Sequence, residues 1–228
     1  MELHYESPAS IADAVRLLAD APAGKARVLA GGTDLLVQMH TGRIEPSLVV
    51  DVKRIPETLA VAVEDGHMVI GAALDSVRLH RFAEFAKHFP GLAEAAALIG
   101  SDQIQGRASI GGNLCNASPA ADTVPPLVAL RSQAEIAGPA GTRRIAVDGF
   151  ATGPGSNALG DGEFLVALRV PLPPPRSADA YLRLIPRTEM DIAVAGAAIS
   201  LTLDAEGRCS SARAALGAVA PTAISVPE

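Results

Sequence analysis

The sequence predicts an α+β protein in which a small parallel sheet precedes antiparallel strands. Two short apolar strands, at 27–30 and 48–51, flank a helical segment at 33–40, which is the order of a right-handed parallel βαβ unit. Two longer strand-like segments, at 192–203 and 209–219, are joined by Asp-Ala-Glu-Gly, as in an antiparallel hairpin. A chain of 228 residues is long enough for one large or two small domains with a buried core.

Charge and residue content exclude several classes of protein. The chain has 19 Lys and Arg against 25 Asp and Glu, a net charge of −6, which repels nucleic acid and anionic membrane surfaces. No run approaches the ~18 uncharged apolar residues of a membrane span. Cys115 and Cys209 are too few for a disulfide framework or an iron–sulfur cluster. The N-terminus lacks the features of a secretory signal, so we expect a cytoplasmic location.

The first part of the chain is predicted to alternate between helix and strand. Ser7 and Pro8 suit the N-cap and first position of a helix that ends near Gly24. A glycine pair then separates the strand at 27–30 from the helix at 33–40. The apolar run at 48–51 closes the parallel unit.

The middle of the chain is predicted to contain helices and one long loop. A strand at 67–73 leads to a helix capped by Asp75 or Ser76, and an alanine-rich helix ends near Ile99. Residues 100–121 are dense in Gly, Ser and Asn and have almost no periodicity. Ordered loops longer than about 12 to 15 residues are usually functional, so we interpret this segment as a binding loop.

The remainder is predicted to be mostly strand. A short helix at 122–130 precedes strands at 133–136, 144–147 and 164–170. Four prolines at 171–175 stiffen the chain and mark a domain boundary. Because a two-stranded hairpin is marginally stable alone, the last ~50 residues are interpreted as the start of a further domain.

A glycine pair between a strand and a helix forms the first candidate binding motif. Unbonded N–H groups and bare glycines at such a turn favour an anion such as phosphate. No Lys and no third Gly follow, so the motif is neither a P-loop nor a dinucleotide fingerprint. The alternative is a tight turn in which Thr33 or Asp34 caps the helix, and we expect the Asp34 carboxylate to point into that cap. The motif consists of Ala30, Gly31, Gly32, Thr33, Asp34 and Leu35.

Residues 108–122 contain the second and more specific motif. A glycine pair offers bare amides, Ser109 and two asparagines can donate hydrogen bonds, and Asp122 can accept one from a ribose hydroxyl. This combination indicates a nucleotide site. For single residues the alternative is that Asp122 caps a helix and Ser118 begins a turn.

Other reactive side chains give weaker signals. Residues 181–192 combine two Arg with two carboxylates, which is typical of a solvated face or a subunit contact. The five histidines have no metal-ligand spacing, so no metal site is predicted. No His lies near Cys115 in the sequence, and packing is its expected role.

In their order and spacing the motifs resemble the FAD-binding subunit of the molybdenum hydroxylases, the family that includes xanthine dehydrogenase and the medium subunit of aerobic carbon monoxide dehydrogenase. The resemblance covers nearly the whole chain. It rests on Ala-Gly-Gly-Thr-Asp-Leu-Leu at 30–36, Leu-Val-Val-Asp at 48–51, Ile-Gly-Ala at 70–72, Ser-Ile-Gly-Gly-Asn at 109–113 with Ser118-Pro119 and Asp122, and Arg-Thr-Glu-Met-Asp-Ile-Ala at 187–193.

The resemblance implies a two-lobed FAD-binding domain, with a small parallel sheet in one lobe and an antiparallel sheet in the other, followed by the start of a small α/β C-terminal domain. We predict the first lobe at 1–56, the second at 57–175 and a partial C-terminal domain at 176–228. The family's C-terminal domain normally continues past the hairpin, so we expect a truncated chain or an unusually short subunit.

The resemblance also assigns residues to FAD. The two glycine motifs grip the pyrophosphate from opposite lobes, Asp122 contacts the nucleotide end or nearby cofactor hydroxyls, and Leu165 and Arg183 line the flavin region. Ile99 stands where some members carry an aromatic residue. No His lies in either motif to bond the flavin, which implies non-covalent FAD. The full predicted set is Leu29, Ala30, Gly31, Gly32, Thr33, Asp34, Leu35, Ile99, Ser109, Ile110, Gly111, Gly112, Asn113, Asp122, Leu165 and Arg183. Many relatives have Ile-Arg-Asn where this chain has Ile104, Gln105 and Gly106, so one cation is missing here.

The chemistry implied needs no nucleophile or general base from this chain, because the flavin transfers the electrons. Electrons would pass from a molybdopterin centre on a large subunit through [2Fe–2S] clusters on a small subunit to this chain's FAD, and then to NAD+, a quinone or oxygen. A dimer of heterotrimers is expected. Two alternatives are a nucleotide-binding scaffold or assembly module without a redox role, and a stand-alone flavoprotein oxidoreductase with the same two-lobed cradle.

Overall fold

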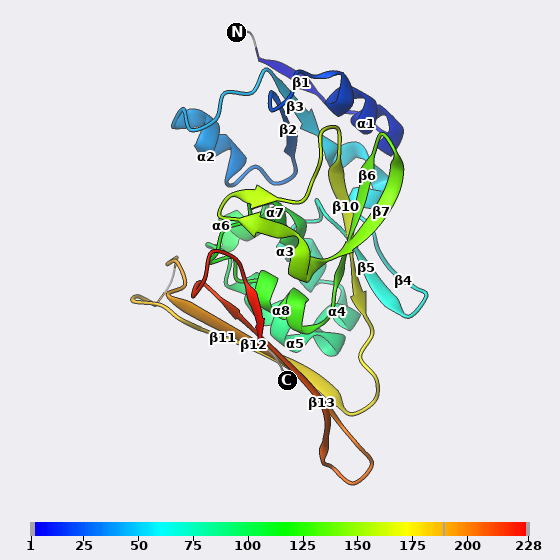
Figure 1. Ribbon diagram of the computed structural model, residues 1–228, viewed down its shortest axis with the longest axis vertical. Coiled ribbons are helices and arrows are strands. Elements are labelled where there is room, and N and C mark those ends of the chain that lie inside the picture. The colour runs from blue at the N-terminus through cyan, green and yellow to red at the C-terminus, as the bar shows by residue number, and fades with distance from the viewer. Residues whose placement is uncertain (1–2, 189, 227–228) are drawn as a thin grey trace.

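The computed structural model describes residues 3–188 and 190–226, which form three main sheets with helices between them (Figure 1). The N-terminal sheet is entirely parallel and has the order β1-β3-β2. Its strands are β1 (His4–Glu6), β2 (Ala26–Leu29) and β3 (Leu48–Asp51). The predicted parallel unit is therefore confirmed, and β1 is an additional edge strand whose three exposed residues gave no apolar signal.

Two helices accompany the small sheet. Helix α1 (Ile11–Asp20) buries Ala14 and Leu18, and its N-cap is Ser10 rather than the predicted Ser7, because the Ser10 Oγ accepts from the Asp13 N–H at 3.1 Å. Helix α2 (Leu35–His40) buries none of its residues. In Figure 1 it stands apart from the sheet, on the side of the glycine motif.

The second sheet is antiparallel, with the order β4-β5-β10-β6-β7. Its central strand β10 is buried from Phe164 to Val170, which matches its largely apolar sequence, and the one charged residue, Arg169, lies 3.8 Å from Glu135. A separate pair, β8 and β9, lies beside it. The strands are β4 (Val61–Glu64), β5 (His67–Gly71), β6 (Gln133–Gly138), β7 (Gly141–Ala146), β8 (Ala151–Gly153), β9 (Ser156–Asn157) and β10 (Phe164–Pro171).

A layer of short helices covers this sheet. The helix predicted after residue 75 is two helices, and Asp75 is its cap, since its Oδ1 accepts from the Arg78 N–H at 2.8 Å. The predicted loop at 100–121 is wrong in part, because it contains two helices too short and too rich in glycine to show a period. The helices are α3 (Ser76–His80), α4 (Ala83–His88), α5 (Pro90–Ala97), α6 (Asp102–Gln105), α7 (Ile110–Asn116) and α8 (Val124–Ala129).

The third sheet covers the other side of the helices (Figure 1). The predicted hairpin forms its centre, and its order is β11-β12-β13-β14. On β11, Asp179 accepts from the Leu92 N–H at 2.8 Å, and a Cβ on Gly91 would lie 2.6 Å from the Ala180 Cα. Helix α5 is therefore seated directly on this strand. The strands are β11 (Ser177–Leu184), β12 (Ala195–Leu203), β13 (Cys209–Gly217) and β14 (Ile224–Val226).

None of the helices in residues 3–188 and 190–226 is long and apolar enough to cross a membrane.

Candidate functional site

The first glycine motif forms a turn with unbonded amides between β2 and α2. Among the described residues, none accepts a hydrogen bond from the backbone N–H groups of residues 31–35. Gly32 has φ of +82°, a conformation that favours glycine. Asp34 occupies the N-cap position of α2, but its exposed side chain makes no capping bond, so the predicted cap is wrong. The turn is held by other contacts.

A lysine behind this turn was not predicted. The Lys53 Nζ donates to the Ala30 carbonyl and to Asp51 Oδ1, both at 2.7 Å, and Tyr5 donates to Asp51 Oδ2 at 2.7 Å. Burial acts to raise the pKa of Asp51, but the bonds from Lys53 and Tyr5 outweigh it and hold that pKa below its ordinary value. The Asp-x-Lys pattern at the end of an apolar strand is the signal that could have identified this cation.

The second glycine motif forms the first turn of α7. The Ser109 hydroxyl accepts from the Gly112 N–H at 3.0 Å and donates to the Ala72 carbonyl at 2.7 Å, so it is fully used as a helix cap. A Cβ on Gly111 would lie 2.6 Å from the Ala72 Cα, whereas one on Gly112 would meet only the Ser109 Oγ, at 3.1 Å. The prediction that both glycines present bare amides is therefore wrong. Gly111 is closed off by Ala72, and Gly112 is the more open of the two.

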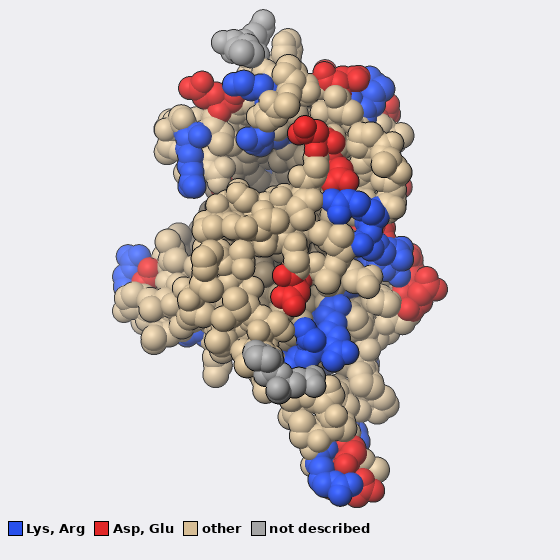
Figure 2. All heavy atoms as spheres, viewed as in Figure 1, with Lys and Arg blue, Asp and Glu red and all other residues tan. Residues whose placement is uncertain are grey.

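The structure brings the two motifs together. The Gln38 Nε2 on α2 donates to the Asn116 Oδ1 on α7 at 3.0 Å. A Cβ on Gly31 would overlap the carbonyl of Arg107, just before the second motif, so the two backbones are in direct contact. Figure 2 shows a hollow between the small sheet and the body of the molecule, with Lys or Arg side chains at its upper wall.

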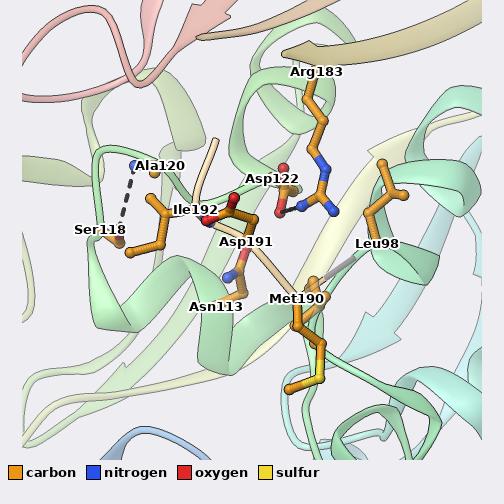
Figure 3. A pocket seen from close by; sticks show the side chains of 11 residues that line it. Leu98, Asn113, Ser118, Ala120, Asp122, Arg183, Met190, Asp191 and Ile192 are labelled. Carbon is orange, nitrogen blue, oxygen red and sulfur yellow. Dashed lines mark hydrogen bonds and ion pairs between the residues drawn. The ribbon is translucent and has the colours of Figure 1, made fainter. Parts of the chain in front are cut away.

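A cavity of about 240 Å³ adjoins the second motif (Figure 3). Four predicted residues line it: Ile99, Asn113, Asp122 and Arg183. Its remaining walls are Leu98, Gly100, Ser118, Ala120, Met190, Asp191 and Ile192. The cavity therefore combines an apolar side with a polar side that carries charge.

Asp122 is the polar centre of this cavity and does not cap a helix. Its Oδ1 accepts from the Tyr181 hydroxyl at 2.8 Å, and its Oδ2 accepts from the Arg183 Nη1 at 2.9 Å. Burial raises the pKa of Asp122, although Tyr181 and Arg183 act in the opposite direction. Burial, together with the Asp122 charge, raises the pKa of Tyr181. The predicted N-cap role fails because Thr123 is the cap residue of α8.

Asn113 connects the second motif to the cavity. Its Oδ1 accepts from the Thr123 hydroxyl at 2.6 Å, which fixes the carboxamide and leaves the Nδ2 donor unbonded among the described residues. Asn113 and Asp191 both line this cavity (Figure 3). Gly112 is therefore followed directly in the chain by Asn113, a residue that lines the cavity.

Some predicted residues have side chains that are buried in the protein and do not line the cavity. Leu165 is 4% exposed in the core on β10, Ile110 is fully buried, and Leu29 is buried at the end of β2. Cys115 packs against the main core, and burial raises the pKa of its thiol to about 12. The packing role expected for Cys115 therefore agrees with the structure.

The segment after β11 contributes residues that the sequence did not indicate. Met190, Asp191 and Ile192 line the cavity, and Asp191 pairs with Arg187 at 3.2 Å. The interpretation of 181–192 as a solvated face is thus wrong for Tyr181 and Arg183, whose side chains point inward. Their spacing of two along a strand is the signal that could have placed them on one face.

Comparisons with known proteins cover nearly the entire chain. Residues 1–173 match the family model for the FAD binding domain in molybdopterin dehydrogenase, and residues 180–228 match that for the CO dehydrogenase flavoprotein C-terminal domain. The chain is 38% identical to the putative xanthine dehydrogenase FAD-binding subunit of Escherichia coli, over 96% of this chain and 75% of that protein. It is 36% identical to the carbon monoxide dehydrogenase medium chain of Afipia carboxidovorans, with the same coverage.

Solved structures of two enzymes contain chains with the same fold as this one. The reconstituted CO dehydrogenase from Oligotropha carboxidovorans contains a chain with a TM-score of 0.93 and 35% identity, and the match covers 99% of this chain and 78% of that one. Quinoline 2-oxidoreductase from Pseudomonas putida contains one with a TM-score of 0.89 and 29% identity, covering 99% and 77%.

Proposed function

The chain belongs to the family of FAD-binding, or medium, subunits of the xanthine and carbon monoxide dehydrogenases, and from this we propose that it binds FAD non-covalently in the hollow between its first two sheets and carries electrons. The observation that supports this proposal best is the position of Asn113. It follows Gly112 in the second glycine motif and also lines the cavity, so a single extended ligand can touch both.

The residues present fit such a ligand. The unbonded N–H groups of residues 31–35 are donors for a diphosphate, and the Lys53 ammonium beneath them supplies a cation. Gly112 leaves room for close approach of the same group. In the cavity, Leu98 and Ile99 supply apolar lining and Arg183 supplies a charge, which suits a flat ring with one apolar and one polar edge.

The bound flavin would supply the electron-transfer chemistry, and the chain's residues would hold it in place. We assign the diphosphate to the amides of the first motif and the open side of Gly112. We assign the ring to the cavity beside Asp122 and Arg183. Ser109, Gly111 and Leu165 act through packing, because their polar atoms or side chains are used inside the protein.

The domain division and the assembly form part of the proposal. We assign one FAD lobe to residues 1–56, a second to 57–175 and a partial C-terminal domain to 176–228. The relatives described as medium chains support a complex with a large molybdopterin subunit and a small [2Fe–2S] subunit, as a dimer of heterotrimers. Electrons would pass from the clusters to this FAD, and then to NAD+, a quinone or oxygen. The two free cysteines are compatible with the cytoplasmic location we propose.

Titration of the purified chain with FAD, FMN and ADP-ribose tests this function. We expect FAD to bind more tightly than either fragment, because FMN lacks the adenylate and ADP-ribose lacks the ring. We also expect the bound flavin to bleach on reduction with dithionite. Binding of ADP-ribose as tight as that of FAD would indicate the nucleotide scaffold. Full turnover without molybdopterin or iron–sulfur chains would indicate the stand-alone flavoprotein.

A further inference from the structure

Tyr181 and Arg183 both reach the same buried carboxylate from one strand. They lie two residues apart on the inner face of β11, and each bonds to a different oxygen of Asp122. Asp122 is 8% exposed, and the Arg183 side chain is 7% exposed. The three side chains therefore form a buried network at one wall of the cavity.

The guanidinium of Arg183 is paired through only one of its nitrogens. A carboxylate can accept two parallel bonds from an arginine, but here Asp122 receives one, from Nη1. The Nε of Arg183 is buried with no partner among the described residues. In Figure 3 one terminal nitrogen bonds to Asp122 while the other is directed to the side of the cavity near Leu98. Donor capacity is thus left for a ligand.

Tyr181 determines how the carboxylate is oriented. The Tyr181 hydroxyl donates to the Oδ1 of Asp122, and in Figure 3 only the other oxygen of that carboxylate is directed at Arg183. The phenol itself is held rigidly, since it is 2% exposed and a Cβ on Gly196 would lie 2.5 Å from its oxygen. Because Gly196 blocks movement of the ring in its direction, the position of Tyr181 on β11 fixes its hydrogen bond to the Asp122 Oδ1.

We propose that Tyr181 is a positioning residue, which holds Asp122 so that one edge of the Arg183 guanidinium stays free. That edge is directed at the bound ring, where the guanidinium favours an anionic ring over a neutral one. The inference rests on the proposed function. For a flavin the anionic form is the product of FAD + 2e− + H+ → FADH−. Buried charges are weakly screened, so a partly compensated guanidinium stabilises this product. Asp191, the other carboxylate at the cavity, is already paired with Arg187.

The conservative variant Tyr181→Phe tests the inference because it keeps the ring packing and removes only the hydroxyl. Without that bond, Asp122 can turn both oxygens to Arg183 and neutralise it more completely. We expect the ratio of affinities for reduced and oxidised FAD to fall about tenfold, which lowers the two-electron midpoint potential by about 30 mV. The affinity for oxidised FAD should change little. The control is Ser177→Ala, which removes a hydroxyl from the other end of the same strand, where it pairs with Thr202, and should leave the potential unchanged.

The potential is measured by titration against a reference dye, with flavin absorbance as the readout, and the melting temperature of each variant without FAD is measured in parallel. A Tyr181→Phe potential equal to that of the unaltered chain would overturn the inference while leaving the proposed function intact. Failure of the unaltered chain to bind FAD would instead refute the proposed function.

Arg183→Gln provides a second test that does not depend on how well Tyr181→Phe folds. Removal of the cation should lower the potential by more than Tyr181→Phe does. Because Tyr181 acts through Arg183, the double variant should show the potential of Arg183→Gln alone. If the double variant instead shifts the potential by the sum of the two single shifts, the positioning role of Tyr181 is overturned.

Discussion

Gln38 and Asn116 join the two glycine motifs through a single hydrogen bond, from Nε2 to Oδ1 at 3.0 Å. Gln38 lies on the helix after the first motif and Asn116 at the end of the helix that the second motif begins, so the bond helps to set the spacing between the motifs, together with the Gly31–Arg107 contact. Gln38→Ala should weaken FAD binding by about 1 kcal/mol, the usual net value of such a bond, which is a roughly fivefold rise in Kd.

The bond's contribution to FAD affinity can be isolated by a double-mutant cycle with Asn116→Ala. Fluorescence quenching of FAD provides the Kd of each variant. If the bond acts by spacing the motifs, the double variant should be no weaker than the weaker single variant. Gln133→Ala, at an exposed position on β6, serves as the control and should bind FAD normally. A normal Kd for Gln38→Ala would show that the motifs are spaced by other contacts.

The neighbouring glycines at 111 and 112 should respond differently to an added methyl group. Gly112→Ala improves helix propensity but places its methyl group 3.1 Å from the Ser109 Oγ, and because these two effects oppose each other, the unfolding free energy should change by less than about 1 kcal/mol. Its methyl group would occupy the proposed approach of the diphosphate, so Kd for FAD should rise at least about tenfold. Gly111→Ala overlaps Ala72, and we expect it to lower the unfolding free energy by about 1 to 3 kcal/mol.

Urea denaturation and FAD titration of both variants separate these effects. The control is Gly153→Ala, since a Cβ there has no atom within 4 Å and lies outside both motifs. FAD affinity in Gly112→Ala equal to that of the unaltered chain would contradict the assignment of this face to the ligand.

The sequence indicated which two segments form the motifs, but not which residues within each motif are open to a ligand. A glycine pair after an apolar strand indicated the region at 29–35, and a glycine pair among Ser, Asn and Asp side chains indicated the region at 109–113. Which glycine is open depends on contacts from distant segments, Ala72 for Gly111 and Arg107 for Gly31. No local pattern carries that information.

The fold was predicted best where burial and sequence agree. Strand β3 was located exactly as an apolar run because the sheet buries it. Strand β11 was missed because its pattern is inverted: the inner residue Tyr181 is 2% exposed beside two charged residues, whereas Leu182 on the outer face is 75% exposed. The inner residues Asp179, Tyr181 and Arg183 bond to α5 and to Asp122, so the buried face of this strand is polar in sequence and lacks the usual apolar alternation.

Asp179 should make the stability of the protein depend on pH. Its carboxylate is buried where β11 meets α5, and this burial raises its pKa, with the Leu92 and Gly91 amides acting in the opposite direction. A folded pKa above the unfolded value of about 3.9 means that folding takes up a proton. The contribution of Asp179 to the unfolding free energy is therefore greatest below about pH 3.9 and decreases as the pH rises through the folded pKa.

Asp179→Asn removes this titration and keeps an oxygen that can accept from Leu92. We expect the decrease in unfolding free energy between about pH 4 and 7 to be smaller in this variant than in the unaltered chain. Urea denaturation at closely spaced pH values measures the slope. Asp204→Asn, at an exposed turn whose hydrogen bonds lower the pKa of Asp204, is the control and should not flatten the slope. Identical slopes for Asp179→Asn and the unaltered chain would rule out this contribution.

The two cysteines should report the stability of α7. Cys209 is exposed, whereas Cys115, near the end of α7, is partly buried against the core, and burial of its thiol raises the pKa to about 12. Because the thiolate is the reactive form, a thiol reagent at pH 8 should modify one cysteine promptly and the second only after local opening of α7 or in denaturant. Prompt reaction of both thiols in the native chain would contradict this placement.

FAD should slow the modification of Cys115 if it contacts the first turn of the same helix. A ligand present at 100 times its Kd stabilises the bound state by about 2.7 kcal/mol, so opening of α7 and reaction of Cys115 should slow about a hundredfold. The rate at Cys209, on the third sheet, should not change. Gly112→Ala should lose most of this protection at the same FAD concentration, because its affinity is lower. Protection of Cys115 that is equal in Gly112→Ala and the unaltered chain would show that the flavin is held without the second glycine motif.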